Sequence, residues 1–223
     1  MAYSIALDGP GGAGKSTIAK QVAKTKGIVY VDTGAMYRSI ALYMLKHDID
    51  IHNEELVNAS LKDIDIQLVY KDGTQCIMLC GEDVSKEIRT PEVSMSASVT
   101  SAYKAVRAFL LDAQRNVAKT QNVIMDGRDI GTVVLPDAQV KIFLSADSKV
   151  RAERRYKELM EKGEEVSFDE VLKDIERRDY RDIHRKESPL RQADDAVLLD
   201  TSYLTFDESV KAVIDLIDSK IGG

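Results

Sequence analysis

Short apolar runs alternate along the chain with stretches whose apolar residues recur every three or four positions. The first pattern is typical of strands covered on both faces of a sheet, and the second is typical of amphipathic helices. The runs predict strands at residues 3–8, 28–32, 122–126, 140–145 and 196–200. The periodic stretches predict helices at residues 16–26, 35–47, 103–119, 148–162, 168–186 and 206–220. This alternation predicts an α/β protein with a mostly parallel sheet wrapped by helices.

Two stretches depart from this rhythm. In residues 64–85, apolar and polar residues alternate on either side of Lys71, Asp72 and Gly73. Such a turn between alternating segments is typical of a β-hairpin, so we expect a small antiparallel insert here. Residues 161–168 form a polar, glycine-containing break between two charged helices, and they predict the turn of a mobile lid.

Length, charge and cysteine content exclude several classes of protein. The 223 residues, 44% of them hydrophobic, can bury one sizeable core, and the net charge of −6 argues against a nucleic-acid-coating protein. No apolar run approaches the length of a membrane span, and the N-terminus lacks the pattern of a secretion signal, so we expect a cytoplasmic location. Cys76 and Cys80 lie four positions apart in a predicted strand, which separates them by about 13 Å, too far for a disulfide. We expect both to be small apolar strand residues.

The segment after the first predicted strand carries the strongest chemical signal. Residues 9–16, GPGGAGKS, match the phosphate-loop pattern G-x-x-x-x-G-K-[S/T] and open a predicted helix. The glycines allow backbone N–H groups to turn toward a phosphate, and the helix N-terminus adds partial positive charge. Lys15 is expected to reach the β- and γ-phosphates, and Ser16 to offer a hydroxyl to Mg²⁺. The predicted nucleotide-binding residues are Gly9, Pro10, Gly11, Gly12, Ala13, Gly14, Lys15, Ser16 and Thr17.

This loop does not identify the phosphate acceptor, because switches, motors and kinases share it. Guanine-reading switches need an Asn-Lys-x-Asp segment, which this sequence lacks. Motor ATPases are usually longer and need oligomer-sensing elements that we do not find. A compact chain with its own arginines favours transfer to a bound small molecule.

Charged residues follow two of the predicted strands. Arg38 lies one turn into the helix after residues 28–32, and Arg128 and Asp129 lie in the turn after residues 122–126. Ligands of open parallel sheets bind at the carboxyl ends of the strands, where these side chains would lie. Arg128 is expected to bind a phosphate, and Asp129 to accept hydrogen bonds from an amino group.

A further set of arginines lies on the two predicted helices of residues 148–186. Arg178, Asp182 and Arg185 share one helical face, because they are spaced at i, i+4 and i+7. The preceding helix carries a similar set, Arg151, Arg154 and Arg155. The spacing fits two alternatives, an exposed face of weak ion pairs or a lid that brings guanidinium groups over a transferring phosphate.

Five motifs, in order, resemble those of the bacterial cytidylate kinases: LDGPGGAGKST, DTGAMYR, EDVSKEIRTPEVS, DGRDIGTVV and RRDYRDIHRKESPL. The similarity covers about residues 3–217. It implies ATP-dependent phosphorylation of CMP and dCMP, with Mg²⁺, by a cytoplasmic monomer that binds neither nucleic acid nor membranes. It also implies the nucleoside monophosphate kinase form of the P-loop fold, with a five-stranded parallel sheet, a lid and an insert that the hairpin stretch matches. The implied single kinase domain has these parts: a core of about residues 1–62, 103–150 and 190–223, a monophosphate-binding insert of about 63–102, and a lid of about 151–189.

The resemblance also implies roles for individual residues. It assigns the acceptor phosphate to Thr33, Arg38 and Arg128. It assigns the cytosine to Ser98, Arg107 and Asp129, the sugar to Arg178 and Asp182, and a further phosphate contact to Arg185. The full expected substrate-binding set is Thr33, Tyr37, Arg38, Ser98, Arg107, Asp126, Arg128, Asp129, Arg178, Asp182 and Arg185. The expected catalytic residues are Lys15, Arg128, Arg154, Arg178 and Arg185. The expected metal ligand is Ser16.

This sequence departs from the family pattern at two positions, and two alternative functions remain open. Many family members have Ser where Thr33 stands, and some monophosphate kinases have Gly where Ser16 stands, which leaves direct binding of Mg²⁺ by Ser16 open. One alternative function is a related kinase that acts on UMP, AMP or another small acceptor such as shikimate. The other is a nucleotide-binding regulator without turnover.

Overall fold

The predicted parallel sheet is present in the computed structural model, which describes residues 2–71 and 74–222. The chain divides into two units, each with its own core. The first unit comprises the chain up to Tyr30 together with the chain from Gln121 onward, and the second comprises Val31–Thr120. The strand β2 begins in the first unit and ends in the second.

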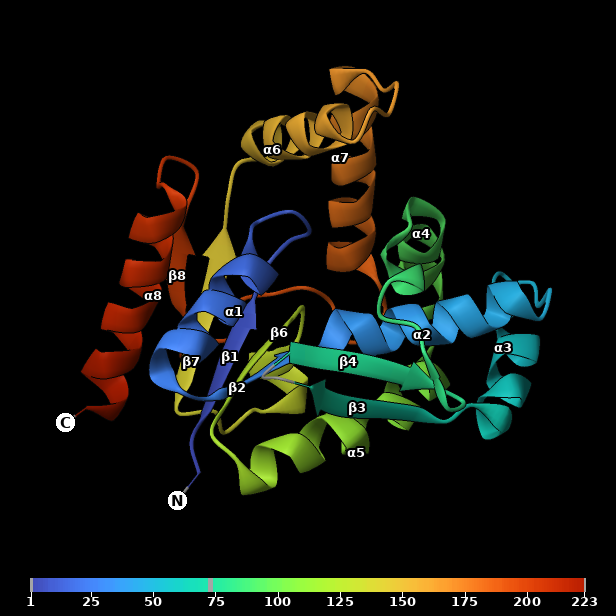
Figure 1. Cartoon of the computed structure of the whole chain (residues 1–223), viewed down its shortest axis with the longest axis horizontal. Coiled ribbons are helices and arrows are strands. Elements are labelled where there is room, and N and C mark those ends of the chain that lie inside the picture. The colour runs from blue at the N-terminus through green and yellow to red at the C-terminus, as the bar shows by residue number, and fades with distance from the viewer. Residues whose placement is uncertain (1, 72–73, 223) are drawn as a thin grey trace. The chain divides into compact units, whose positions relative to one another are not determined.

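The sheet of the first unit has the strand order β2-β6-β1-β7-β8, and β1 pairs in parallel with both β6 and β7 (Figure 1). Its strands and helices, in chain order, are β1 (Ser4–Asp8), α1 (Lys15–Lys26), β2 (Val29–Asp32), β6 (Val123–Gly127), β7 (Val140–Ser145), α6 (Ser148–Glu161), α7 (Phe168–His184), β8 (Val197–Asp200) and α8 (Phe206–Ile221). Because the paired strands are parallel, the loops after β1, β6 and β7 leave the sheet at the same edge. The predicted α/β fold with a five-stranded parallel sheet is confirmed.

The centre of this sheet is buried on both faces, as the continuous apolar runs predicted. Ile5, Ala6 and Leu7 of β1 are all fully buried. Ile5 and Leu7 belong to a core to which α1 contributes Val22 and α8 contributes Val213. This packing fixes the end of β1, and therefore the start of the phosphate loop.

The helices α6 and α7 pack against each other around a small apolar cluster of their own, which includes Ala152, Leu159 and Val171. Figure 1 shows α6 and α7 on the side of the sheet where β1 ends and its loop leads to α1. A capping box starts α7. The side chain of Ser167 accepts the backbone N–H of Glu170, and the side chain of Glu170 accepts the backbone N–H of Ser167. The two predicted helices are therefore present and packed together, and their role as a mobile lid stays a prediction.

The second unit contains a separate antiparallel sheet in the order β3-β4-β5. The remaining strands and helices, in chain order, are α2 (Thr33–Lys46), α3 (Glu54–Ser60), β3 (Ile66–Lys71), β4 (Thr74–Leu79), β5 (Glu82–Asp83), α4 (Pro91–Thr100) and α5 (Lys104–Thr120). The predicted antiparallel insert is confirmed by the pairing of β3 with β4, while Asp72 and Gly73 of the predicted turn lie outside the described residues. The short strand β5 adds a third member that the pattern did not predict.

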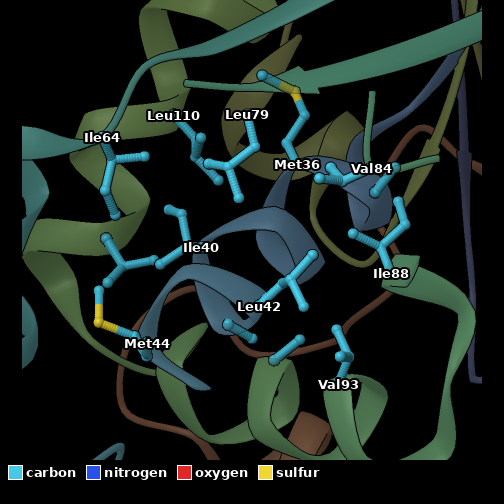
Figure 2. Close-up of a cluster of buried hydrophobic side chains, with 14 of the residues drawn as sticks. Met36, Ile40, Leu42, Met44, Ile64, Leu79, Val84, Ile88, Val93 and Leu110 are labelled. Atoms are coloured by element: carbon cyan, nitrogen blue, oxygen red, sulfur yellow. The ribbon is translucent and has the colours of Figure 1, made fainter. Parts of the chain in front are cut away.

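The core of the second unit is built around α2 (Figure 2). Met36, Ile40 and Met44 project from this helix and are fully buried. Leu79 of β4 and Leu110 of α5 pack into the same cluster. The sheet and the helices of this unit thus hold α2 in place, together with the polar residues at its N-terminus.

Two predictions need correction. Cys80 is not a strand residue, because β4 ends at Leu79 and Cys80 follows it, exposed, with a φ of 49°. Its thiol lies 3.6 Å from the carbonyl oxygen of Asp63, while Cys76 is a half-buried residue of β4, and both thiols are free. The second correction concerns α3 and α4, two helices that the pattern did not predict.

Within the described residues, no helix is long and apolar enough to cross a membrane.

Candidate active site

The phosphate loop joins β1 to α1, and its backbone is set by close packing as well as by its glycines. Gly9 has a φ of 147°, and a Cβ at this position would lie 2.0 Å from the carbonyl oxygen of Leu144 on β7. Gly14 has a φ of 85° and forms the N-cap of α1. Lys15 is buried, and its Nζ donates to the carbonyl oxygen of Pro10 at 2.7 Å. The loop therefore holds its lysine against its own backbone.

Two arginines lie against this loop. A Cβ on Gly11 would lie 3.3 Å from Nη2 of Arg128 and 3.4 Å from Nε of Arg178. Burial lowers the pKa of Lys15 well below its usual value, and Arg128 and Arg178 lower it further, while Asp126 and Asp8 oppose the shift. Such a cluster of positive charges favours the binding of an anion beside the lysine.

Arg128 follows β6 and is paired with α7. Its Nε donates to Oδ2 of Asp182 at 2.8 Å. Burial alone would raise the pKa of Asp182, but Arg128 and Arg178 outweigh it and hold the pKa below the usual value. Two segments far apart in sequence therefore meet here, and the expected sugar contact of Asp182 stays a prediction.

Arg185 and Asp129 form a second link between α7 and the turn after β6. Nη2 of Arg185 lies 3.5 Å from Oδ1 of Asp129, and both side chains are buried. Nε of Arg185 also donates to the carbonyl oxygen of Ser188 at 2.7 Å. The face of α7 that carries Asp182, with Arg185 just beyond the helix, is thus turned toward charged partners of the sheet edge, which contradicts the alternative of an exposed, salt-bridged face.

A buried carboxylate that sequence analysis did not single out holds the turn after β6. Asp8, the last residue of β1, accepts N–H groups from Ile130 at 2.8 Å and Gly131 at 2.7 Å, at the start of the π-helical turn Ile130–Val134. Burial raises the pKa of Asp8 to about 6, although both hydrogen bonds act against this rise. Asp8 therefore ties the start of the phosphate loop to the segment that carries Arg128 and Asp129.

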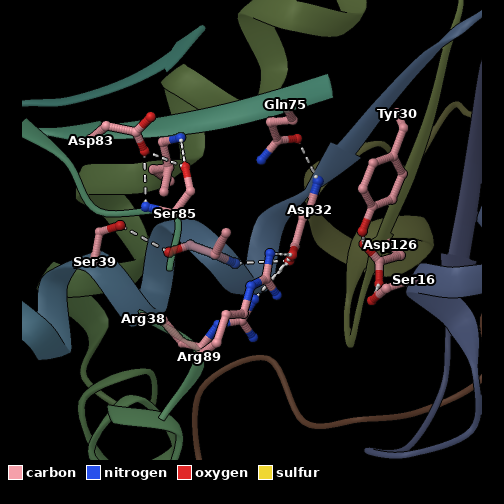
Figure 3. Close-up of polar contacts among 12 residues, drawn as sticks. Ser16, Tyr30, Asp32, Arg38, Ser39, Gln75, Asp83, Ser85, Arg89 and Asp126 are labelled. Carbon is pink, nitrogen blue, oxygen red and sulfur yellow. Dashed lines mark hydrogen bonds and ion pairs between the residues drawn. The ribbon is translucent and has the colours of Figure 1, made fainter. Parts of the chain in front are cut away.

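The first residues of α1 carry an oxygen-rich contact (Figure 3). Oγ of Ser16 donates to Oδ2 of Asp126 at 2.6 Å, and the hydroxyl of Tyr30 donates to Oδ1 at 3.0 Å. Carboxylate and hydroxyl oxygens are the ligands that Mg²⁺ prefers, so these groups fit the ion that phosphoryl-transfer enzymes use. Among the residues that the structure describes, no group of three or more His, Cys, Asp or Glu side chains forms a metal site.

The three arginines of α6 have separate partners. Arg151 is buried and makes a two-point contact with Asp179 of α7, at 3.1 and 2.6 Å, while its Nη1 also donates to the carbonyl oxygen of Gly11 at 2.9 Å. Arg154 donates to the carbonyl oxygen of Thr201 at 2.8 Å. Arg155 pairs with Glu158 on its own helix. Of these three arginines, Arg151 has a hydrogen bond to the phosphate loop within the described part of the chain, and the predicted catalytic role of Arg154 stays a prediction.

In the second unit, two arginines meet one carboxylate at the start of α2 (Figure 3). Asp32 is the N-cap of this helix and accepts the N–H of Ala35 at 2.8 Å. Nη2 of Arg38 and Nη2 of Arg89 lie 3.0 and 2.9 Å from Oδ2 of Asp32. Burial would raise the pKa of Asp32, but the two arginines outweigh it and lower the pKa. Arg89 was not predicted, because 57 positions separate it from Asp32.

The remaining predicted residues of the second unit lie on three helices. Thr33 is buried at the first position of α2. The guanidinium carbon of Arg107, on α5, lies 5.4 Å from the ring centroid of Tyr37, and Nη1 donates to the carbonyl oxygen of Ser101. Within the described residues, Oγ of Ser98 on α4 is buried without a hydrogen-bond partner. Tyr37 and Arg107 are thus brought together, and Ser98 keeps an unused hydroxyl.

The predicted site residues therefore form one group in each unit. The first unit gathers Lys15, Ser16, Asp126, Arg128, Asp129, Arg178, Asp182 and Arg185 around the loop and the turn after β6. The second brings Arg107 of α5 to Tyr37 of α2, and Thr33 and Arg38 lie on the same helix α2. Sequence analysis missed Asp8, Tyr30 and Arg89, although Asp8 directly precedes the loop and Arg89 lies in one of the motifs of the resemblance.

Comparison with known proteins identifies the family. The family model described as cytidylate kinase matches residues 5–219. A cytidylate kinase from Caldicellulosiruptor saccharolyticus is 48% identical over 219 residues, which cover 98% of this chain and 97% of the relative. A cytidylate kinase from Caldanaerobacter subterraneus subsp. tengcongensis is 49% identical over 223 residues, which cover 100% of this chain and 98% of the relative.

One solved structure shares the fold. The crystal structure of an uncharacterized protein from Eubacterium ventriosum has a TM-score of 0.52 and 14% identity, and the match covers 97% of this chain and 99% of that one. At this identity the likeness concerns the fold alone. The family match and the relatives extend over nearly the whole chain, and the chain belongs to the cytidylate kinase family.

Proposed function

We propose that this chain phosphorylates CMP and dCMP to CDP and dCDP, with ATP as the donor, by direct in-line transfer. The family membership supports the reaction. The observation that carries the proposal is the placement of Lys15, Arg128 and Arg178 against the phosphate loop. Phosphoryl transfer depends mainly on positioning and on neutralising charge, and these residues supply both.

Charge neutralisation is the main task of such a site. Two unit negative charges about 4 Å apart repel by about 4 kcal/mol at an effective dielectric of 20. Lys15 would exchange the carbonyl of Pro10 for phosphate oxygens, and Arg128 would remain oriented by Asp182. A single well-placed arginine supplies a rate factor of about 10³–10⁵ in related phosphoryl transfers.

Ser16 and Asp126 are the residues that would hold Mg²⁺, which supplies further charge neutralisation when it is bound. The hydroxyl proton of Ser16 points to Asp126. The lone pairs of the Ser16 oxygen therefore remain available as a ligand. We assign Asp126 to this role rather than to the substrate contact expected from the sequence.

The polar residues of the second unit fit the acceptor nucleotide. Arg38 would bind its phosphate, because Asp32 fixes one edge of the guanidinium while Nε is buried without a hydrogen-bond partner among the described residues. Ser98 has an unused buried hydroxyl, and Arg107 is held by Tyr37 and Ser101. A hydroxyl that accepts from the exocyclic amine and an arginine that donates to ring acceptors suit cytosine better than uracil.

No general base is needed for this reaction. A nucleoside monophosphate is largely dianionic at neutral pH, because the second pKa of a phosphate monoester is about 6. The attacking oxygen therefore carries no proton that must be removed. The site residues accordingly bind, orient and neutralise, and none of them is required to transfer a proton.

The test is a comparison of acceptors. ADP formation would be measured with CMP, dCMP, UMP, AMP and shikimate under one set of conditions, and CMP and dCMP are expected to be fastest. If AMP is faster than CMP by about tenfold, a difference of about 1.4 kcal/mol in the barrier, the assignment is wrong. An absence of acceptor-dependent ATP consumption with every acceptor would instead favour the nucleotide-binding regulator.

Asp129→Asn tests the proposed reading of the base. The substitution replaces an acceptor oxygen by a donor amide, so we expect a larger loss with CMP, whose exocyclic amine is a donor, than with UMP, which presents a carbonyl. Equal losses for both acceptors would show that Asp129 only supports Arg185.

We also propose that the protein is a cytoplasmic monomer, as the resemblance implies. Light scattering of the purified chain tests the oligomeric state.

A further inference from the structure

We infer that Tyr30 is a positioning residue for the magnesium site, acting through Asp126 on the hydroxyl of Ser16. The inference rests on the proposed function, because it concerns the ion that the proposed reaction uses. It adds a residue that no motif of the sequence marked. The contact Tyr30–Asp126–Ser16 carries it (Figure 3).

Both oxygens of one carboxylate are held in this contact. Oδ1 of Asp126 accepts from the hydroxyl of Tyr30 at 3.0 Å, and Oδ2 accepts from Oγ of Ser16 at 2.6 Å. Asp126 is 5% exposed and Tyr30 is 8% exposed. Because water has little access to either group, rotation of the carboxylate would leave a buried hydroxyl without its acceptor, which is costly. Tyr30 therefore fixes the plane of the Asp126 carboxylate.

The orientation of this carboxylate decides where the proton of Ser16 points. A serine hydroxyl has one proton and two lone pairs. While Oδ2 accepts this proton, the lone pairs are left for a cation. If Asp126 turned away, the proton of Ser16 would rotate more freely and would occupy the lone-pair side for part of the time. The phenol of Tyr30 thereby preserves the donor form of Ser16 that a cation needs.

Tyr30 is itself held firmly, which makes its hydroxyl a separable feature. It lies on β2, beside β6, which carries Asp126, in the order of the sheet. Its ring belongs to the core of the first unit, and Nζ of Lys20 lies 5.6 Å from the ring centroid. Replacement by phenylalanine keeps the ring, its packing and the cation–π contact. The substitution Tyr30→Phe thus removes the hydroxyl that donates to Asp126 and keeps the rest of the side chain.

The experiment measures binding of ATP to the whole chain by calorimetry, once with excess Mg²⁺ and once with excess EDTA. For Tyr30→Phe we expect the Kd of Mg·ATP to rise about tenfold, within the range of 10–100-fold that loss of an outer-shell partner of a metal site typically causes. The Kd of metal-free ATP is expected to change by less than about twofold, because the loop and Lys15 are unaltered. A rise confined to the magnesium form supports the inference, and equal changes in both forms, or none in either, overturn it.

Tyr103→Phe is the matched control. The hydroxyl of Tyr103 donates to the carbonyl oxygen of Ile51 at 2.9 Å, so this variant loses a phenolic hydrogen bond of similar length in the second unit. It should leave both ATP affinities unchanged. If Tyr30→Phe lowers the Tm much more than Tyr103→Phe does and affects both forms of ATP, Tyr30 serves stability rather than the metal site.

A double-mutant cycle tests whether Tyr30 acts through Asp126. In an Asp126→Asn background, Tyr30→Phe should cause no further loss of Mg·ATP affinity, because the carboxylate that it orients is gone. Additive losses would overturn the inference. These binding measurements need no phosphate acceptor. Failure of the acceptor comparison would therefore reject the proposed function, whereas unchanged Mg·ATP binding would reject the role of Tyr30 alone.

Discussion

Asp182 on α7 accepts a hydrogen bond from Arg128 at 2.8 Å, across 54 positions of sequence. Asp182 is buried, and the pair joins α7 to the turn after β6. Replacing one partner of a buried ion pair leaves the other charge uncompensated, which typically costs 3–5 kcal/mol. This contact therefore combines a role in stability with the orientation of a phosphate-binding arginine.

Asp182→Asn should lower the free energy of unfolding at pH 7 by about 3 kcal/mol. Because the pKa of Asp182 is lowered in the folded state, the stabilisation by the wild-type carboxylate is present above its unfolded pKa of about 3.9 and is lost as the pH falls through the folded value. Denaturant unfolding of both proteins between pH 3 and pH 7 checks this. A difference in stability that stays constant across this range would contradict the ion pair.

Asp8→Asn should show the opposite dependence on pH. The pKa of Asp8 is raised to about 6 in the folded state, so the stabilising contribution of its carboxyl group is fully present below about pH 3.9 and is lost as the pH rises through about 6. The stability of the wild type relative to Asp8→Asn should therefore increase by about 2 kcal/mol between pH 7 and pH 4. Unfolding curves at these values test the shift, and a flat difference would show that Asp8 titrates normally.

Lys15→Met should abolish most turnover without destabilising the chain. Burial lowers the pKa of Lys15, and Arg128 and Arg178 lower it further, so removing the side-chain charge relieves an unfavourable interaction in the free protein. We expect kcat to fall by about 10²–10³, the typical loss when one donor to a developing charge is removed, and the Tm to stay equal or rise. Unchanged kcat would contradict the role of the loop, and a large fall in Tm would show that Lys15 is mainly structural.

Asp179→Asn should loosen the attachment of α7 to the phosphate loop. Asp179 neutralises Arg151, whose Nη1 also binds the carbonyl oxygen of Gly11. We expect faster amide hydrogen exchange in α7 and a higher KM for ATP. Asp174→Asn is the matched control, because Asp174 pairs with Arg177 in an exposed contact on the same helix, worth about 0–1 kcal/mol. Equal exchange rates in the two variants would show that Arg151 does not hold α7.

The strands and the longer helices could be predicted because burial on both faces and helical periodicity leave a clear pattern. The prediction of residues 206–220, for example, differs by one residue from α8 at its C-terminus. The helix α4 was missed because its sequence, PEVSMSASVT, mixes small, polar and apolar residues without a helical period. Its start nevertheless carried a signal, since Thr90 caps it and Pro91 is its first residue.

The candidate site was predictable where a motif or a strand end marks it, as for Lys15 and Arg128. The partners of these residues were not predictable, because they depend on contacts between distant segments. Asp8 accepts the backbone N–H groups of Ile130 and Gly131. Every residue except proline has such a group, so the sequence does not indicate which of them Asp8 binds. Tyr30 reads as an ordinary strand residue until the sheet order places β2 beside β6.

Glycine is required at the first position of the phosphate loop because of strand packing, and not because of the nucleotide. Any side chain on Gly9 would collide with the backbone oxygen of Leu144, with or without a nucleotide. A descendant of this chain that lost its enzymatic activity would still retain this glycine for as long as β7 stayed next to β1. Gly9 is thus a signature of shared architecture, and its presence in a distant homologue is no proof of surviving catalysis.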